Sequence, residues 1–181
     1  MAAAGAVVEP TMLRFEGREI EVAAVVAPRN VMRELAQVFG TRRQGPLALS
    51  DAVIVLPTCQ RSAMELVNWG DDVAAEKDRL LEAFAAFARD LCAALHADGH
   101  WADFIDPCSG LPALDTAGAT TVYDEVMSHQ TLLKYELSQA GPCKVLLHPR
   151  WGSAVYPATC VTDAPADVLL KALAKYGLGA D

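Results

Sequence analysis

The strongest constraint on the fold is a long apolar stripe in the middle of the chain. Its large side chains recur three or four residues apart, as on one face of an α-helix, at Leu80, Phe84, Phe87, Leu91 and Leu95. The stripe predicts a helix over Val73–Leu95 with Asp71 or Asp72 as its N-cap. The Asp98-Gly99 pair predicts the helix end, because glycine adopts left-handed backbone angles without strain. We expect this stripe to face the protein core and not a partner.

Short segments rich in β-branched residues precede this helix. Strands are predicted at Glu19–Val26, Asp51–Leu56 and Met64–Trp69. The polar stretch Pro57–Ser62 is interpreted as a hairpin connection between the last two strands. A further helix is predicted over Val31–Phe39, with Asn30 as its N-cap and Gly40 as its stop.

The C-terminal part of the chain alternates between apolar segments and turns. Trp101–Ile105 is predicted as a strand, and Pro107–Thr121 is rich in turn residues and predicts a surface excursion. The remaining predicted elements are a helical piece around Tyr123–His129, a hairpin of Cys143–His148 with Ser153–Val161, and a last helix from Pro165 to Gly177. Together the elements predict an α+β fold with a mainly antiparallel sheet and flanking helices. A disordered lead-in is expected over residues 1–10 and a single domain over residues 11–181.

Charge and composition limit the classes of partner. The 181-residue chain has a formal net charge of −8 and an isoelectric point near 4.9, which argues against nucleic acid and anionic membranes as main partners. No apolar run in the sequence approaches the roughly 20 residues that a membrane-spanning helix needs. The five cysteines form no Cys-x-x-Cys pair, so they predict neither a disulfide framework nor a zinc knuckle. They favour a reducing compartment in which at least one thiol is free.

Two residue pairs were candidates for catalysis, but each also has a structural interpretation. Asp103 and Asp106 point to opposite faces of the predicted strand, so we expect turn-forming roles and no carboxylate pair. Cys108 and His148 would act as nucleophile and base only if the fold brought them together, and no third orienting residue accompanies them. We therefore expect no catalytic residues.

Arg150 and Trp151 stand at the tip of the predicted C-terminal hairpin. Because Trp and Arg dominate binding hot spots, both are candidate partner-binding residues. The alternative is that the tryptophan folds back onto the sheet. The histidines lack the two-His helical spacing of a zinc site, and the glycines form neither a dinucleotide fingerprint nor a P-loop.

Two dense blocks carry a resemblance to a known family. They are Ala94–Leu111 (ALHADGHWADFIDPCSGL) and Gly141–Gly152 (GPCKVLLHPRWG), followed by Val161-Thr162-Asp163-Ala164. In this order and spacing they resemble the C-terminal domain of the methylmalonic aciduria and homocystinuria type D (CblD) family of cobalamin trafficking adaptors. The run Trp-Ala-Asp-Phe-Ile-Asp-Pro from Trp101 to Pro107 is the most specific part. The resemblance extends from about Glu21 to the C-terminus.

The resemblance implies a nitroreductase-like α+β fold that has lost its flavin and cobalamin pockets and is not an enzyme. It implies that the protein holds no cofactor alone and contacts cobalamin in complex with the cobalamin-processing protein CblC. Such adaptors direct cobalamin to methionine synthase and methylmalonyl-CoA mutase, so cytoplasmic and mitochondrial locations are expected. The alternative function is a nitroreductase-like flavin- or thiol-dependent oxidoreductase, although the sequence shows no basic cluster for a flavin phosphate.

The resemblance also points to one candidate metal-ligating residue. Family members carry Gly-Cys-Cys-Lys-Val, and the first cysteine coordinates the cobalt of cobalamin held by CblC. Here proline occupies that position in Gly141-Pro142-Cys143-Lys144-Val145, so Cys143 is the remaining candidate cobalt ligand. Strand alternation groups Cys143 with Val145 and Leu147, which favours a small buried thiol. A ligand role requires that the Gly141-Pro142 turn bring the thiol to solvent, where Lys144 would favour the thiolate.

Overall fold

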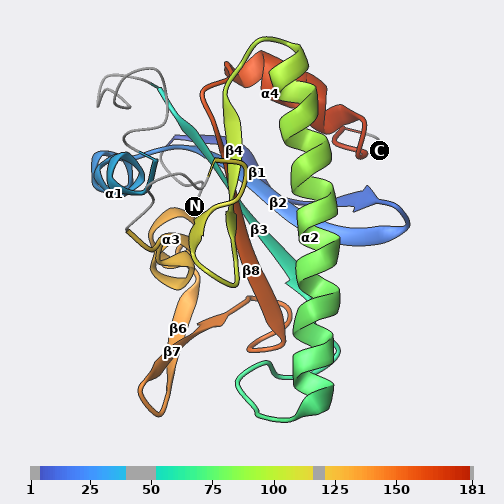
Figure 1. Cartoon of the computed structure of the whole chain (residues 1–181), viewed down its shortest axis with the longest axis vertical. Coiled ribbons are helices and arrows are strands. Elements are labelled where there is room, and N and C mark those ends of the chain that lie inside the picture. The colour runs from blue at the N-terminus through green and yellow to red at the C-terminus, as the bar shows by residue number, and fades with distance from the viewer. Residues whose placement is uncertain (1–4, 40–51, 116–120, 180–181) are drawn as a thin grey trace.

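The computed structural model describes residues 5–39, 52–115 and 121–179. Its main sheet has six strands in the order β1-β2-β3-β8-β4-β5, and every neighbouring pair is antiparallel (Figure 1). These strands are β1 (Ala6–Phe15), β2 (Arg18–Val26), β3 (Ile54–Arg61), β4 (Ala102–Asp106), β5 (Leu111–Pro112) and β8 (Val155–Thr162). A separate two-stranded ribbon consists of β6 (Glu136–Ala140) and β7 (Cys143–Leu147). The predicted α+β class with a mainly antiparallel sheet is confirmed.

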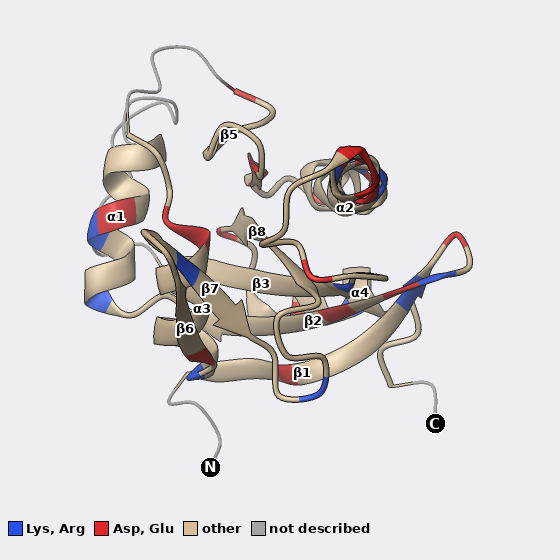
Figure 2. Ribbon diagram, turned by 90° about the horizontal axis from the view of Figure 1, so that it is seen from below, with Lys and Arg blue, Asp and Glu red and all other residues tan. Residues whose placement is uncertain are grey.

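Helices cover both faces of the main sheet. On one face, α2 (Asp71–Ala97) and α4 (Ala166–Ala174) pack against the sheet through the larger core cluster. On the other face lie α1 (Arg29–Phe39) and α3 (Glu125–Leu133), which pack through a second cluster. Figure 2 shows α1 and α2 on opposite sides of the strands. The β6–β7 ribbon packs beside α3 on the α1 face, so this face has a more irregular cover than the other.

The predicted long helix is confirmed as α2. Its buried residues include the whole apolar stripe, and each Leu or Phe side chain removed from water contributes about 1.5–3 kcal/mol. The N-cap is Gly70 without a side-chain cap bond, so the prediction of an aspartate cap is wrong. Asp71 and Asp72 instead lie in the first turn, where their negative charges interact favourably with the positive end of the helix dipole. Within the described ranges, no helix is both long and apolar enough to span a bilayer.

Strand β3 is longer and later than predicted. It runs straight through the stretch interpreted as a hairpin connection, and Met64–Trp69 is a loop, so both of those predictions are wrong. The polar residues of this stretch suggested a surface connection, but hydrogen bonds to neighbouring elements allow their side chains to be buried. The Thr58 hydroxyl donates to the Ala158 carbonyl at 2.9 Å, and the Gln60 amide donates to the Leu80 carbonyl at 2.8 Å.

The predicted C-terminal hairpin is also wrong. Strand β7 pairs with β6, whereas β8 inserts between β3 and β4 in the main sheet. The His148–Gly152 segment does close a tight turn, since the backbone groups of these two residues exchange hydrogen bonds of 2.9 Å. After this turn, however, the chain leaves the ribbon. Strand alternation cannot reveal such a change of partner, because a strand has the same pattern in either sheet.

Several element ends differ from the predictions. Strand β1 begins at Ala6, so the expectation of a disordered lead-in is wrong for residues 6–10, and residues 1–4 lie outside the described residues. Asn30 lies inside α1 and does not cap it, while Gly40 is outside the described residues. The helical piece expected near Tyr123 is α3, and the Asp124 side chain caps it by accepting from the Met127 N–H. The last predicted helix is confirmed as α4, with Pro165 as its N-cap.

Candidate functional site

Cys143 is exposed at the first position of β7. In this strand Leu146 is the fully buried side chain, whereas Cys143 and Lys144 are exposed. The prediction of a buried Cys143 is therefore wrong. The ribbon packs against the rest of the protein through Leu146, together with Tyr135 just before β6. Leu146 lies on the face of β7 opposite to Cys143, Val145 and Leu147, the face that the sequence pattern had placed inside. Gly141, with φ of 58°, provides the left-handed turn that brings the thiol to the surface.

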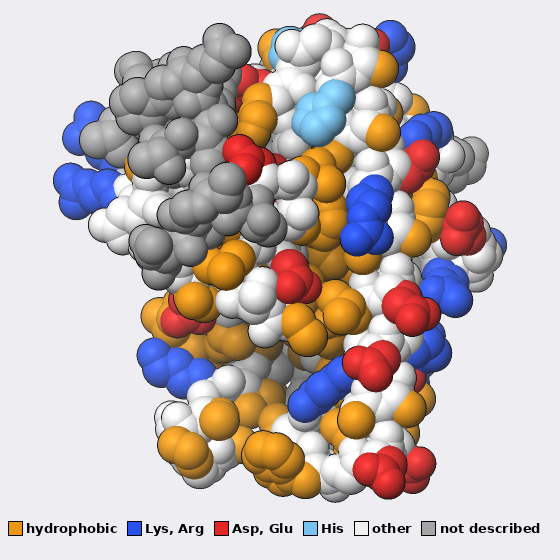
Figure 3. Space-filling model, viewed as in Figure 1, with side chains coloured by type: hydrophobic (Ala, Val, Ile, Leu, Met, Phe, Trp, Pro, Cys, Tyr) orange, Lys and Arg blue, Asp and Glu red, His pale blue; other side chains and the backbone are white. Residues whose placement is uncertain are grey.

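A hollow of about 470 Å³ lies beside Cys143, between the β6–β7 ribbon and the loop before α2. Its lining is largely apolar and includes Leu66, Val67, Trp69, Val126, Pro142 and Cys143. Trp69 is 98% exposed, which is unusual for the largest apolar side chain. Figure 3 shows hydrophobic side chains gathered around a hollow in the lower part of this face, between the ribbon and α2. The exposed thiol therefore borders an apolar surface of the kind that marks interaction sites.

The five cysteines fall into two environments. Cys59, Cys92 and Cys160 are buried, whereas Cys108 and Cys143 are exposed. Burial raises the pKa of Cys92 to about 12 and raises the pKa of the Cys59 and Cys160 thiols well above their usual value. The thiolate is the form that binds a metal, so the three buried thiols would each need a positive charge beside the sulfur to bind one. The two exposed cysteines are therefore the candidates for contact with a metal held by a partner.

Trp151 folds back against the protein, and Arg150 lies over it. The indole stacks on the His148 imidazole, with ring centroids 3.9 Å apart and 14° between the planes. The Arg150 guanidinium carbon lies 5.0 Å from the centroid of the Trp151 ring. The same guanidinium donates to Oε2 of Glu21 at 2.9 Å, although the Arg150 side chain is 55% exposed. The two candidate partner-binding residues thus form the outer layer of a stack, and a partner-binding role stays a prediction.

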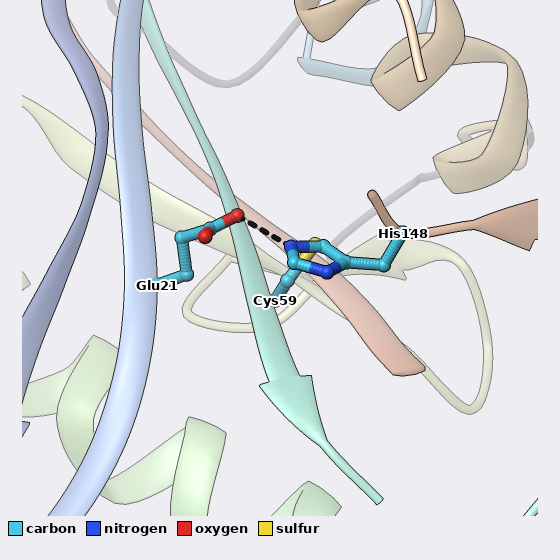
Figure 4. Close-up of side chains that lie close together, drawn as sticks. All are labelled: Glu21, Cys59 and His148. Atoms are coloured by element: carbon cyan, nitrogen blue, oxygen red, sulfur yellow. Dashed lines mark hydrogen bonds and ion pairs between the residues drawn. The ribbon is translucent and has the colours of Figure 1, made fainter. Parts of the chain in front are cut away.

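Beneath this stack lies a buried polar cluster centred on Glu21 of β2 (Figure 4). Oε1 of Glu21 accepts hydrogen bonds from His148 Nε2 at 2.8 Å and from the Tyr135 hydroxyl at 2.7 Å. Burial opposes ionisation of Glu21, but the hydrogen bonds from His148, Tyr135 and Arg150 outweigh it and hold the pKa of the carboxyl below its usual value. Cys59 lies opposite Glu21 in the β2–β3 register. Glu21, Cys59 and His148 bring their potential ligand atoms within 4.8 Å of one another.

A second carboxyl, that of Glu125, is enclosed at the start of α3. Its Oε2 accepts the Thr159 hydroxyl at 2.6 Å, whereas Oε1 is buried with no hydrogen-bond partner among the described residues. His129, one turn later, places Nδ1 2.8 Å from the Glu125 carbonyl and Nε2 3.0 Å from the Thr58 carbonyl. Burial raises the pKa of Glu125 to about 8 and lowers the pKa of His129. Both side chains therefore favour their neutral forms near pH 7.

The predicted turn role of Asp106 is confirmed, whereas Asp103 lies inside β4 and binds backbone groups there and at Leu114 instead of forming a turn. Oδ1 of Asp103 accepts two backbone N–H groups at 2.7 and 3.0 Å, and burial raises the pKa of this carboxyl. The Asp106 carboxylate accepts two backbone N–H groups at 3.2 Å in the turn that follows β4. Cys108 is exposed in that turn, whereas His148 is buried beside Glu21. The structure therefore does not assemble Cys108 and His148 as a nucleophile and base.

The Glu21 cluster is the part of the site that the sequence did not predict. One signal exists for Glu21, because a carboxylate inside a strand of β-branched residues needs hydrogen-bond partners when the strand is buried. Cys59 carries no such signal, since it lies in the stretch interpreted as a connection. Tyr135 and His148 flank the same end of the ribbon, next to the Glu136–Leu147 pair, so their approach to Glu21 depends on how the ribbon packs against the distant strand β2.

Fold and site together define a class: an α+β protein with an antiparallel sheet, an exposed thiol beside an apolar hollow, and a buried polar cluster under the connection between ribbon and sheet. A family profile described as "Methylmalonic aciduria and homocystinuria type D protein" matches residues 6–174. The chain belongs to this family, which confirms the resemblance in the sequence.

Curated relatives agree with this assignment. A protein named "Cobalamin trafficking protein CblD" from Rattus norvegicus is 32% identical over 155 residues, which cover 84% of this chain and 49% of the relative. Proteins of the same name from Homo sapiens and Gallus gallus are 31% and 30% identical, with the same shares covered. The chain therefore spans about half the length of the curated relatives that it matches.

Proposed function

We propose that this protein is a non-enzymatic adaptor in intracellular cobalamin trafficking. Its family and the names of its relatives support a role in that process. The proposed partner is a CblC-like cobalamin-processing protein that holds the cobalamin. The adaptor keeps no cofactor when alone and contacts cobalamin within the complex.

The exposure of Cys143 carries this proposal. A thiolate is a soft ligand that suits a late first-row metal such as the cobalt of cobalamin. Cys143 protrudes at the start of β7, directly after the left-handed turn at Gly141, so it can approach a partner-held metal without rearrangement of the sheet. Pro142 occupies the ligand position of the resemblance and has no ligand atom in its side chain. We assign the cobalt-ligand role to the next residue, Cys143.

The hollow beside Cys143 supports a docked complex. A partner that covers this hollow would bury the exposed Trp69 and the thiol in one step. Buried aromatic anchors surrounded by weaker contacts are typical of binding hot spots. Arg150 and Trp151 lie beyond the other end of β7 and are proposed as secondary contacts.

The proposed destinations of the cobalamin are methionine synthase in the cytoplasm and methylmalonyl-CoA mutase in mitochondria. Methionine synthase is also a candidate direct partner. These assignments follow from the family alone, and we propose no contact with nucleic acid or with a membrane. A direct check is to follow labelled cobalamin into both enzymes in cells that lack the endogenous adaptor and express this chain.

A spectral titration tests the proposal. Cobalamin bound to CblC is titrated with wild-type protein, with Cys143→Ser and with Cys108→Ser, which removes the other exposed thiol. We expect a thiolate–cobalt absorption band with the wild type and with Cys108→Ser, and no band with Cys143→Ser.

The other outcomes discriminate among the alternatives. A band that survives in Cys143→Ser contradicts the cobalt-ligand role. If gel filtration shows a complex but no absorption band appears, the protein acts as an adaptor through surface contacts alone. Absence of a complex would contradict the adaptor proposal, and a flavin absorption band in the purified protein would favour the oxidoreductase alternative.

A further inference from the structure

We propose that Glu21, Cys59 and His148 form a site for one divalent transition-metal ion, with Zn²⁺ as the best match. The site is separate from Cys143 and independent of the proposed adaptor function. The three residues supply one carboxylate oxygen, one sulfur and one imidazole nitrogen, which are the ligand types that zinc prefers in proteins.

The fold places the three ligands by two different devices. Glu21 and Cys59 are Cα partners in the antiparallel pair β2–β3, so their side chains leave the same face of the sheet side by side. His148 enters over them from the end of β7, and Figure 4 shows the three side chains turned toward one another. All three residues are buried, at 5%, 1% and 3% exposed respectively.

The distances are close to those of a metal site. Ligand bonds of about 2.0–2.3 Å in a tetrahedral zinc site place the ligand atoms roughly 3.3–3.8 Å apart. Here the Glu21 Oε1 to His148 Nε2 distance is 2.8 Å, and all ligand atoms lie within 4.8 Å of one another. An ion between them would therefore separate the first pair slightly and would require the Cys59 sulfur to move inward by no more than about 1 Å.

The metal-free and metal-bound states differ by a defined set of protons. Without metal, the Arg150 N–H donates to His148 Nδ1 at 3.2 Å, so Nε2 carries the hydrogen that is donated to Glu21. Zinc would bind Nε2 and shift that hydrogen to Nδ1, at the cost of the long bond from Arg150. The Cys59 thiol would lose its proton to solvent, because the ion provides the positive charge that stabilises a buried thiolate. Binding thus releases one proton for each ion.

The surroundings provide outer support and an entry path. The Tyr135 hydroxyl and the Arg150 guanidinium hold the two oxygens of Glu21, as outer hydrogen bonds commonly orient metal-binding carboxylates. A surface hollow of about 540 Å³ is lined by Tyr135, His148 and Arg150. The half-exposed Arg150 side chain lines this hollow and donates to Glu21, so its outward rotation would admit an ion. A water molecule from the hollow would complete a four-coordinate site.

The test uses Co²⁺ as a spectroscopic substitute for Zn²⁺ on the reduced whole chain. The background is Cys108→Ser/Cys143→Ser, in which both exposed thiols are removed. We expect one equivalent of Co²⁺ to produce a sulfur-to-cobalt charge-transfer band that Zn²⁺ displaces. Adding Cys59→Ser should abolish the band, and Tyr135→Phe should weaken affinity by roughly 10- to 100-fold, as loss of an outer partner does.

Two further measurements keep the test decisive if Cys59→Ser does not fold, which circular dichroism would reveal. Zinc X-ray absorption of the folded background protein should show one sulfur at about 2.3 Å and nitrogen or oxygen neighbours at about 2.0–2.1 Å. Zinc addition in weak buffer should release one proton per ion. The proposal is overturned by a zinc shell without sulfur, by a cobalt band that persists in folded Cys59→Ser, or by absence of binding to the folded background protein.

Discussion

Glu21 and Glu125 are two enclosed carboxyls on the same face of the sheet, yet they favour opposite charge states. The Glu21 side chain is 6% exposed and its pKa is lowered, whereas the Glu125 side chain is 13% exposed and its pKa is raised to about 8. Both carboxyls are largely enclosed, but only Glu21 favours the ionised form near neutral pH. Glu21 receives hydrogen bonds from three side chains, whereas Glu125 receives one side-chain hydrogen bond and its Oε1 has no partner within the described part of the chain. Burial raises the pKa of both carboxyls, and the three donors of Glu21 outweigh that effect whereas the hydrogen bonds from Thr159 to Glu125 do not.

The largest expected effect is that of Glu21→Ala. It removes the shared acceptor of Tyr135, His148 and Arg150, and we expect the free energy of unfolding to fall by about 3 kcal/mol. Urea denaturation at pH 7 measures the change. The control is Glu19→Ala on the same strand, whose exposed ion pair predicts a change within about 0.5 kcal/mol. Equal effects of the two substitutions would refute the donor-based account.

The pH dependence of stability should have opposite signs for the two carboxyls. The folded pKa of Glu125, about 8, lies above its unfolded value of 4.5, so its contribution is fully present below pH 4.5 and is lost as the pH rises to 8. We expect a loss of up to about 1.4 kcal/mol per pH unit inside this window. The lowered pKa of Glu21 stabilises the fold above pH 4.5, and this contribution is lost as the pH falls through the folded value.

Urea titrations from pH 3 to 9 can separate these contributions. In Glu125→Gln, which resembles the protonated side chain, the decline between pH 4.5 and 8 should disappear while the acid limb remains. A decline that persists in Glu125→Gln would show that another group titrates there, and the contrast between the two carboxyls would be lost.

Removal of a single donor from Glu21 should have a smaller effect. Tyr135→Phe deletes one hydroxyl and leaves the bonds from His148 and Arg150, so we expect a loss of about 1 kcal/mol. It should also raise the pKa of Glu21, because one of the bonds that favour the carboxylate is gone. A shift of the acid unfolding limb to higher pH is the measurement. An unchanged limb would assign the low pKa to the other two donors.

The smallest effect is expected for Cys143→Ser. This thiol is exposed, so the free energy of unfolding should change by less than about 0.5 kcal/mol. Cys59→Ser should cost more, because it places a hydroxyl in a buried site next to Glu21. Thermal unfolding of both variants gives the comparison. A large loss in Cys143→Ser would mean that the thiol is structural, which would count against its proposed role toward a partner.

The sequence predicted those parts of the fold that depend on local periodicity. The apolar stripe of α2 and the helix before Gly40 show a helical period over enough residues to be read directly, and β2 shows a local enrichment in β-branched residues. The predictions failed where residues distant in sequence determine whether a segment is buried or which strand it pairs with. The polar residues of β3 are buried because Ala158 and Leu80 accept their hydrogen bonds, and β7 pairs with β6 although β8 is also nearby in sequence.

The candidate site divides in the same way. The resemblance singled out Cys143, but the strand pattern wrongly placed its thiol inside, because the ribbon packs through Leu146 on its other face. The Glu21 cluster joins β2, β3 and the end of the ribbon away from its turn, so no local window contains it. Within the sequence, only the carboxylate of Glu21 inside a strand of β-branched residues pointed to it.

The position of β8 has a consequence for synthesis of the chain. Val155–Thr162 is the last of the described strands in chain order and is synthesised after β3 and β4, yet it lies between them and pairs with both. Until it arrives, β3 is an open sheet edge and β4 lacks its neighbour in the main sheet, which are conditions that favour aggregation. Pairings across about 100 residues also slow folding. A premature stop codon before Val155 would therefore leave two sheet fragments that need a chaperone, and would not give a smaller working protein.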